Sequence, residues 1–209
     1  MGYKPLAEEA LRRIDVGRIR GLAGQLGSDD PAVRAGAIEA LRKETGLDFH
    51  FDPSAPDAAR GRAVRRWTQY AEHLREAVEV KLPKVLEPPH QQNKHHRAWA
   101  ADYLGTEAPH PAFVGILKTV VANGAEEEYT RIKSLKAVSR IPHEGLVEYF
   151  IGQLDGPLAG QAWLVLRRIT QAGIANDNDD WADVKRRYEQ WWRKNRETFV
   201  YDHDKAMWE

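Results

Sequence analysis

Apolar residues recur along this chain at the three- and four-residue spacing of an amphipathic helix, and no segment reads convincingly as a strand. The clearest example places Val16, Ile19, Leu22, Ala23 and Leu26 on one face of a single helix. The pattern therefore predicts an all-α chain. The helices that we expect cover residues 6–14, 16–26, 32–44, 57–80, 94–104, 111–122, 126–140, 144–154, 157–171 and 180–197.

The third of these helices carries clear signals at both of its ends. Asp30 suits the N-cap position, because its carboxylate can accept a backbone N–H that has no partner inside the helix. Pro31 suits the first helical position, and Gly46 stands where a C-cap glycine belongs. Arg34, one turn into the helix, is expected to hydrogen-bond the acidic turn that precedes it.

Weaker copies of this helix pair recur downstream. Residues 29–41 correspond to residues 97–104, 130–141 and 156–166. A longer internal similarity has an offset of 125 residues and aligns residues 41–45 with residues 166–170. The same offset places Ala37 on Ala162 and Trp67 on Trp192. Repetition of a helix pair predicts a solenoid, in which each pair packs on the next.

Two segments interrupt the helical pattern. Residues 47–56 read as an ordered loop that Phe49 and Phe51 pin in place. Residues 81–93 contain three prolines, which forbid a continuous helix because each removes a backbone donor. We expect a single solenoid domain over residues 1–209, divided into an N-terminal module (1–80), a Pro-rich loop (81–93), a C-terminal module (94–198) and a tail (199–209).

Composition narrows the functional classes. The chain has 209 residues, 42% of them hydrophobic, which is enough for a substantial core. Its formal net charge is zero, so no overall field attracts nucleic acid or anionic lipid. The absence of cysteine excludes disulfides and thiol catalysis. The sequence predicts no membrane span, and its first residues lack the apolar core of a signal peptide, so we expect a cytoplasmic protein by default.

Catalytic and metal-binding patterns are not found. The eight histidines are scattered, and the adjacent His95 and His96 point about 100° apart on a helix, so they cannot share one metal ion. Only His143-Glu144 forms a His-Glu pair, so the sequence lacks the several such pairs that an iron site on successive helices would need. No phosphate-binding loop or nucleophile motif is present. We expect no enzyme activity, no metal and no cofactor.

Seven tryptophans are a notable enrichment. Four of them sit at helical spacing beside aliphatic residues and are predicted to pack in the core, namely Trp67, Trp163, Trp191 and Trp192. Trp99 follows His95 and His96 and is expected to be half exposed. Trp208, in the tail, would be costly to leave in water. Trp99 and Trp208 are therefore the candidate interface aromatics.

The segment LGSDDPAVR at residues 26–34, with Ala37, Ala40 and Leu41, resembles the HEAT and HEAT-like repeats of armadillo-type α-solenoids. Residues 131–138 and 154–166 resemble degenerate copies. The resemblance implies a right-handed α-α superhelix of about four degenerate helix pairs with extra Trp-bearing helices. It also implies a non-enzymatic protein-binding or scaffold role, with the second helix of each pair on the concave face.

Basic residues dominate the helices that this resemblance would place on the concave face. They form a candidate groove for an acidic segment of a partner protein. The alternative is a solvated face without a binding function, and self-association is a further possibility. The candidate residues are Arg42, Lys43, Lys94, Arg97, Arg131, Lys133, Lys136, Arg140, Arg167 and Arg168.

Two other functions stay open. Some HEAT-like solenoids are alkylpurine DNA glycosylases, which grip the duplex with a basic concave face and place Trp and Asp near the lesion. The zero net charge makes nucleic acid the less favoured partner here. Others are lyase-like chaperones that seat a tetrapyrrole chromophore, an expectation that rests on family analogy alone.

Overall fold

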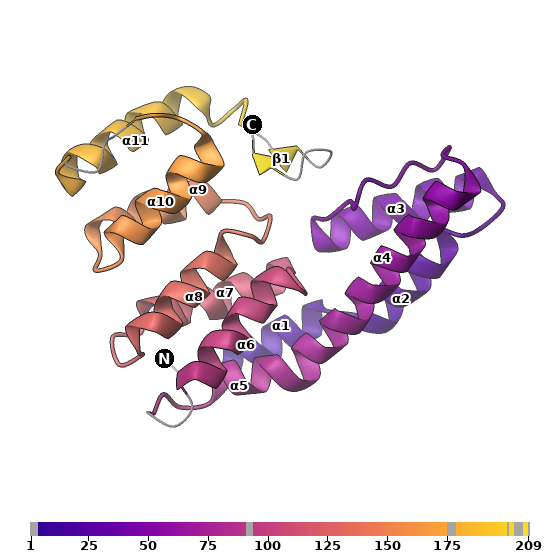
Figure 1. Ribbon diagram of the computed structural model, residues 1–209, viewed down its shortest axis with the longest axis horizontal. Coiled ribbons are helices and arrows are strands. Elements are labelled where there is room, and N and C mark those ends of the chain that lie inside the picture. The colour runs from indigo at the N-terminus through magenta and orange to yellow at the C-terminus, as the bar shows by residue number, and fades with distance from the viewer. Residues whose placement is uncertain (1–3, 91–93, 175–178, 200, 203–206, 209) are drawn as a thin grey trace. The chain divides into compact units, whose positions relative to one another are not determined.

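In the computed structural model the chain is predominantly helical, as the apolar pattern predicted (Figure 1). The structure describes residues 4–90, 94–174, 179–199, 201–202 and 207–208. A two-residue antiparallel pair, β1 (Tyr201–Asp202) and β2 (Met207–Trp208), is the exception, and no strand was predicted there. Within these ranges, no helix is both long and apolar enough to cross a membrane.

The chain divides into two compact units, residues 1–142 and residues 143–209. The sequence predicted a division at the Pro-rich residues 81–93 instead. The helical segments on both sides of that stretch pack against each other, so they share one core and belong to one unit.

The first unit consists of helices joined by short turns. Its elements are α1 (Lys4–Arg13), α2 (Val16–Gln25), α3 (Pro31–Thr45), α4 (Asp57–Glu76), a π-helical turn η1 (Ala77–Lys81), α5 (Leu82–Leu86), α6 (Lys94–Thr106), a 3-10 turn η2 (Pro111–Phe113), α7 (Val114–Ala122) and α8 (Glu128–Val138). Helix α4 runs from the α2–α3 pair to the group that contains α5, α6 and α8 (Figure 1).

The predicted ends of α3 are confirmed. The Asp30 carboxylate accepts the backbone N–H of Ala32 at 2.8 Å. Gly46 ends the helix with a φ of 70°, a backbone conformation that glycine adopts without strain. The Arg34 guanidinium donates to the Ser28 and Asp29 carbonyls at 2.8 and 2.9 Å, so it holds the acidic turn as expected.

The loop at residues 47–56 is pinned by its aromatic residues. The Phe49 ring packs edge-on against Trp67, with ring centroids 4.7 Å apart, and also against Tyr70. Phe51 is buried as well, and Trp67 is fully buried. The loop thereby forms part of the core beside α2 and α4.

The helical chain continues beyond residue 80, where a loop was predicted. Pro83 is the second residue of α5, and the wide turn η1 comes directly before α5. A proline ring clashes with the carbonyl four residues earlier in a regular α-helix, and a π turn relieves such a clash. The proline therefore changes the helix type and does not end the helix.

Helices α6 and α8 run in the same direction and touch along their backbones (Figure 1). Near their N-termini, the Thr130 hydroxyl donates to the Lys94 carbonyl at 3.2 Å. Near their C-termini, a Cβ placed on Gly105 would lie 2.4 Å from the Cα of Ala137. Only glycine fits there, and α7 packs against α8 as the connecting helix.

The second unit contains α9 (Leu146–Gly152), a 3-10 turn η3 (Gln153–Asp155), α10 (Ala159–Thr170) and α11 (Trp181–Asn195). Helix α9 packs on both α10 and α11. The core of this second unit contains the fully buried residues Phe150, Leu166, Val184 and Tyr188.

Helices α3 and α10 end in the same way, where the sequence showed its internal similarity. The Thr45 hydroxyl donates to the carbonyl four residues earlier at 2.7 Å, and the Thr170 hydroxyl does the same at 2.7 Å. Each hydroxyl also accepts the N–H two residues later, at 3.1 and 3.3 Å. Both helices then end in a residue with positive φ, Gly46 and Gln171.

Candidate functional site

Arg97 is the clearest correction to the predicted basic groove. Its side chain is 1% exposed and forms an ion pair with Glu126, whose side chain is fully buried. The Arg97 Nε lies 3.3 Å from Glu126 Oε1, and its Nη2 contacts Oε2. Arg97 therefore joins α6 to the turn before α8 and is not available to a partner.

Arg131 also has a structural role. Its Nε donates to the Val121 carbonyl at 2.8 Å, which satisfies a carbonyl near the end of α7. Arg34 bonds the turn before α3 in a comparable way. Arg34 holds the turn before its helix, whereas Arg131 joins α8 to the end of α7, so at least part of the Arg131 side chain is engaged within the protein.

Three of the predicted cations do share an exposed face, that of α8 and the residues just after it. The Asp102 carboxylate, from α6, holds two of them: Lys133 at 3.1 Å and Arg140 at 2.9 Å. Lys136 is exposed and forms no ion pair within the part of the chain that the structure describes. One carboxylate thus pairs with two of the three cations, and this set of residues has a positive balance.

Two exposed aromatic rings lie beside these cations. Trp99 is 63% exposed, more than any other large hydrophobic residue that the structure describes, and Tyr129 is 45% exposed. The ring of His95, one turn before Trp99 on α6, contacts Tyr129 at a centroid distance of 6.1 Å. The Lys133 ammonium lies 5.9 Å from the Tyr129 ring. We call this set the α6–α8 surface: Trp99, Asp102, Tyr129, Lys133, Lys136 and Arg140.

The other predicted residues lie elsewhere. Arg42 pairs with the buried Asp48 at 2.9 Å, and Lys43 lines a hollow beside α3. Lys94 is half-buried at the start of α6. On α10, Arg167 lies 5.4 Å from the Trp163 ring and Arg168 is exposed. Trp208 is the second predicted interface aromatic, and its side chain lies outside the part of the chain that the structure describes.

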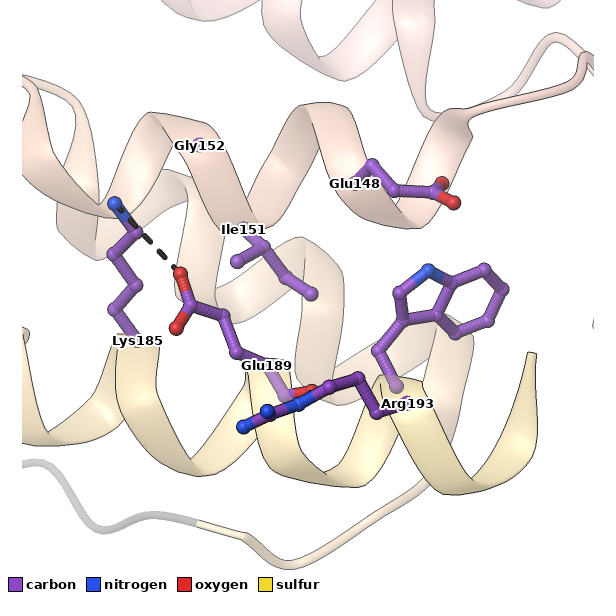
Figure 2. A pocket seen from close by; sticks show the side chains of 7 residues that line it. Glu148, Ile151, Gly152, Lys185, Glu189 and Arg193 are labelled. Atoms are coloured by element: carbon purple, nitrogen blue, oxygen red, sulfur yellow. Dashed lines mark hydrogen bonds and ion pairs between the residues drawn. The ribbon is translucent and has the colours of Figure 1, made fainter.

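A second site was not predicted. A hollow of about 530 Å³ lies between α9 and α11, as Figure 2 shows. An adjoining hollow of about 480 Å³ shares Glu148 and Trp192 with it. We call the first hollow the α9–α11 groove. Its lining residues are Glu148, Ile151, Gly152, Lys185, Glu189, Trp192 and Arg193.

Sequence reasoning missed this groove because it placed Trp192 in the core. Trp67 and Trp163 are buried as predicted, but Trp191 and Trp192 are only half-buried. Their rings stack at a centroid distance of 6.1 Å, and Phe199 packs edge-on against both. The cluster is thus packed on one side and open on the other.

The charges of the α9–α11 groove differ between its two walls. On α11, the Lys185 ammonium contacts Asp155 and lies 3.9 Å from Glu189 (Figure 2). The hydrogen bond to Asp155 raises the pKa of Lys185, so its charge is held in place. On α9, Glu148 is exposed and forms no ion pair with any residue of the described ranges. The α9 wall therefore carries a free carboxylate.

Titratable groups elsewhere are structural. Burial, with a smaller effect from Arg13, lowers the pKa of His110 to about 4. Its Nδ1 accepts the Ala112 N–H at 3.2 Å and caps η2. Tyr103 donates to Glu76 at 2.8 Å, and burial and this bond raise its pKa. No cluster of three or more metal-ligating side chains occurs among the residues with described positions.

Comparisons with known proteins add no family to this description. No family model matches the chain, and no curated protein or solved structure matches it. Its function is therefore inferred from its own residues and surfaces.

Proposed function

We propose that this chain is a HEAT-like helical-repeat protein that binds an acidic segment of a partner protein on its α6–α8 surface. The role is that of a non-enzymatic scaffold or accessory subunit. The observation that carries the proposal is the pairing of two exposed aromatic rings, Trp99 and Tyr129, with cations on two parallel helices.

Three local features support the repeat architecture. Helices α6 and α8 lie parallel and in contact, as the second helices of successive pairs do in a solenoid. Arg34 and Arg131, each in the first turns of its helix, both donate to backbone carbonyls that precede that helix in the chain. The Thr45 and Thr170 ends of α3 and α10 match. A right-handed superhelix of about four degenerate helix pairs is the architecture that we propose.

The chemistry of the α6–α8 surface supports an acidic, partly apolar ligand. Exposed tryptophan and tyrosine rings are the side chains that most often dominate binding energy in protein interfaces. Within the α6–α8 surface, three cations stand against the single carboxylate of Asp102, which pairs with Lys133 and Arg140, and this balance favours an anionic ligand. A segment that places an aliphatic side chain on Trp99 and a carboxylate near Lys136 matches both features.

Binding of a defined peptide tests this function. The probe is a fluorescein-labelled peptide of alternating Glu and Leu, with a Gln-Leu peptide as its neutral match, measured by fluorescence anisotropy. We expect Trp99→Ala to weaken binding of the acidic peptide about ten-fold and Lys136→Glu about five-fold.

The matched control is Arg62→Glu, which reverses an exposed cation on α4 and should leave binding unchanged. Equal affinity for the Gln-Leu peptide, or equal loss in the control variant, would contradict an acidic ligand on the α6–α8 surface.

One observation favours a second candidate, a nucleic-acid-binding protein that resembles the alkylpurine DNA glycosylases. Trp99 and Asp102 lie three residues apart on the same side of α6, beside the cations of α8. Against it, both Asp102 oxygens are held in ion pairs and the net charge of the chain is zero. Labelled duplex DNA in the same assay, at low and at moderate salt, separates the two candidates, because binding to phosphates falls steeply with salt.

A further inference from the structure

We infer that the α9–α11 groove is a second binding site, which accepts a cationic side chain, arginine or lysine, presented by a partner protein. The inference goes beyond the proposed function, because it concerns another surface with the opposite charge preference. It rests on the shape of the groove, on the free carboxylates of one wall and on the indole of Trp192.

The α9 wall of the groove carries negative charge alone. Residues 143–152 contain Glu144 and Glu148 and no lysine or arginine. Both glutamates are exposed, and neither forms an ion pair with a residue that the structure describes. Glu148 lines both adjoining hollows, and Glu144 lines the second. A cation that enters the α9–α11 groove therefore meets the Glu148 carboxylate, and Arg196, which lines the second hollow, forms no ion pair with either glutamate.

Trp192 supplies an aromatic surface next to Glu148. Its indole lines both hollows and is held by stacking on Trp191 and by edge contact with Phe199, at centroid distances of 6.1 and 5.6 Å. A guanidinium or ammonium group placed over an indole face is attracted by the ring electrons. An indole beside a free carboxylate thus gives a cation two attractions at once.

The cations of α11 do not occupy this place. Lys185 is bound to Asp155 and lies near Glu189. The Nε of Arg193 donates to the Glu189 carbonyl at 3.3 Å, and its guanidinium is directed along α11 (Figure 2). Glu148 lies on the opposite helix and stays free for a ligand (Figure 2).

The groove has room for such a side chain. Its volume of about 530 Å³ exceeds that of one arginine or lysine side chain, and Ile151 and Gly152 form an apolar part of its lining. The methylene groups of the ligand would lie against this lining, while its charged end reaches Glu148. Long cationic side chains bind in this divided way, with the stem on apolar atoms and the charge near a carboxylate.

Nuclear magnetic resonance of the full chain tests the inference. The indole N–H signal of Trp192 is assigned by its loss in Trp192→Phe. The probe is N-acetyl-arginine amide, and its match is N-acetyl-citrulline amide, which has the same shape without the charge. We expect a saturable shift of the Trp192 signal with the arginine compound and none with citrulline.

Variants locate the site. Glu148→Gln should weaken binding of the arginine probe about five-fold, since it removes the carboxylate and keeps the shape. Glu39→Gln, an exposed glutamate on α3, and Lys136→Glu, on the α6–α8 surface, should leave it unchanged. Equal shifts with citrulline, no shift with either compound, or full binding by Glu148→Gln would each overturn the inference, whatever the α6–α8 surface binds.

Discussion

The α6–α8 pair and the α9–α11 pair each present tryptophan and charged side chains to solvent, but the first pair is in close backbone contact and the second lines a hollow. Gly105 lies against Ala137, so α6 and α8 touch along their backbones and their large side chains stand outward. Ile151 and Trp192 line the hollow between α9 and α11, and a Cβ on Gly152 of α9 would meet no atom within 4 Å. A small residue thus allows a close helix approach at Gly105 and faces open space at Gly152.

The two pairs also differ in how they use charge. Inside the α6–α8 pair, Arg97 and Glu126 form a buried ion pair, while Lys133, Lys136 and Arg140 stay near solvent. Around the second pair, Glu148 on α9 and Glu144 just before it form no ion pair with a residue that the structure describes. The first pair thus buries one ion pair, and both pairs leave charged side chains at the surface.

The largest expected effect comes from removing the buried ion pair between Arg97 and Glu126. Glu126→Gln leaves the Arg97 charge buried without its partner, and we expect a loss of about 4 kcal/mol in the free energy of unfolding. Urea unfolding followed by circular dichroism measures it. Glu128→Gln, an exposed neighbour, should change the value by less than about 0.5 kcal/mol. Equal effects of the two variants would show that the ion pair is not essential to the packing.

Acid should also loosen the first unit, through His110. Burial lowers its folded pKa from 6.5 to about 4, so the unfolded chain takes up a proton first as the pH falls. The stabilisation is complete above pH 6.5 and is lost as the pH falls to about 4, with a total of about 3 kcal/mol.

The control for this pH dependence is His110→Asn, which can still cap η2 but does not titrate. Urea unfolding across this pH range should show a smaller acid loss in the variant than in the wild type. The same acid loss in both proteins would assign it to other groups.

Two glycine substitutions test the difference in packing between the α6–α8 pair and the α9–α11 pair. Gly105→Ala places a Cβ 2.4 Å from a backbone atom of α8, and we expect it to cost about 2 kcal/mol. Gly152→Ala meets nothing within 4 Å and should stabilise α9 by about 0.5 kcal/mol, since alanine favours helix. Thermal unfolding measures the change in stability of each variant. Changes of the same sign would contradict the difference in packing between the two helix pairs.

The smallest expected effect concerns the charge of the α6–α8 surface. Asp102→Asn releases Lys133 and Arg140, so the Glu-Leu peptide should bind about three-fold more tightly at low salt. The gain should shrink as salt increases. Anisotropy titrations at two salt concentrations check it, and weaker binding by the variant would mean that Asp102 itself contacts the ligand.

Local sequence signals predicted the helices well because their causes are local. Asp30, Pro31 and Gly46 act on adjacent backbone groups, and the structure confirms each role. The same holds for two acceptors of Arg34, which lie five and six residues away, whereas its bond to the Pro53 carbonyl, 19 residues later, was not predicted. Such contacts can be inferred without knowing the fold.

The site was only partly predictable, because it depends on contacts between distant residues. In the sequence Arg97 does not differ from the other cations. Its burial depends on an ion pair with Glu126, which lies 29 residues later. The α9–α11 groove depends on which face of Trp192 the neighbouring helix leaves open. By contrast, the exposure of Trp99 was expected from its polar neighbours and is confirmed.

Capture of partner proteins from native lysate tests the α6–α8 surface most directly. Immobilised wild-type chain is compared with a Trp99→Ala/Lys136→Glu double variant and with Arg62→Glu, at moderate salt, with mass spectrometry of what each retains. We predict one defined set of proteins on the wild type and on Arg62→Glu, and its loss from the double variant. Retention of the same proteins by all three chains, or of nucleic acid alone, would contradict a protein-binding role for this surface.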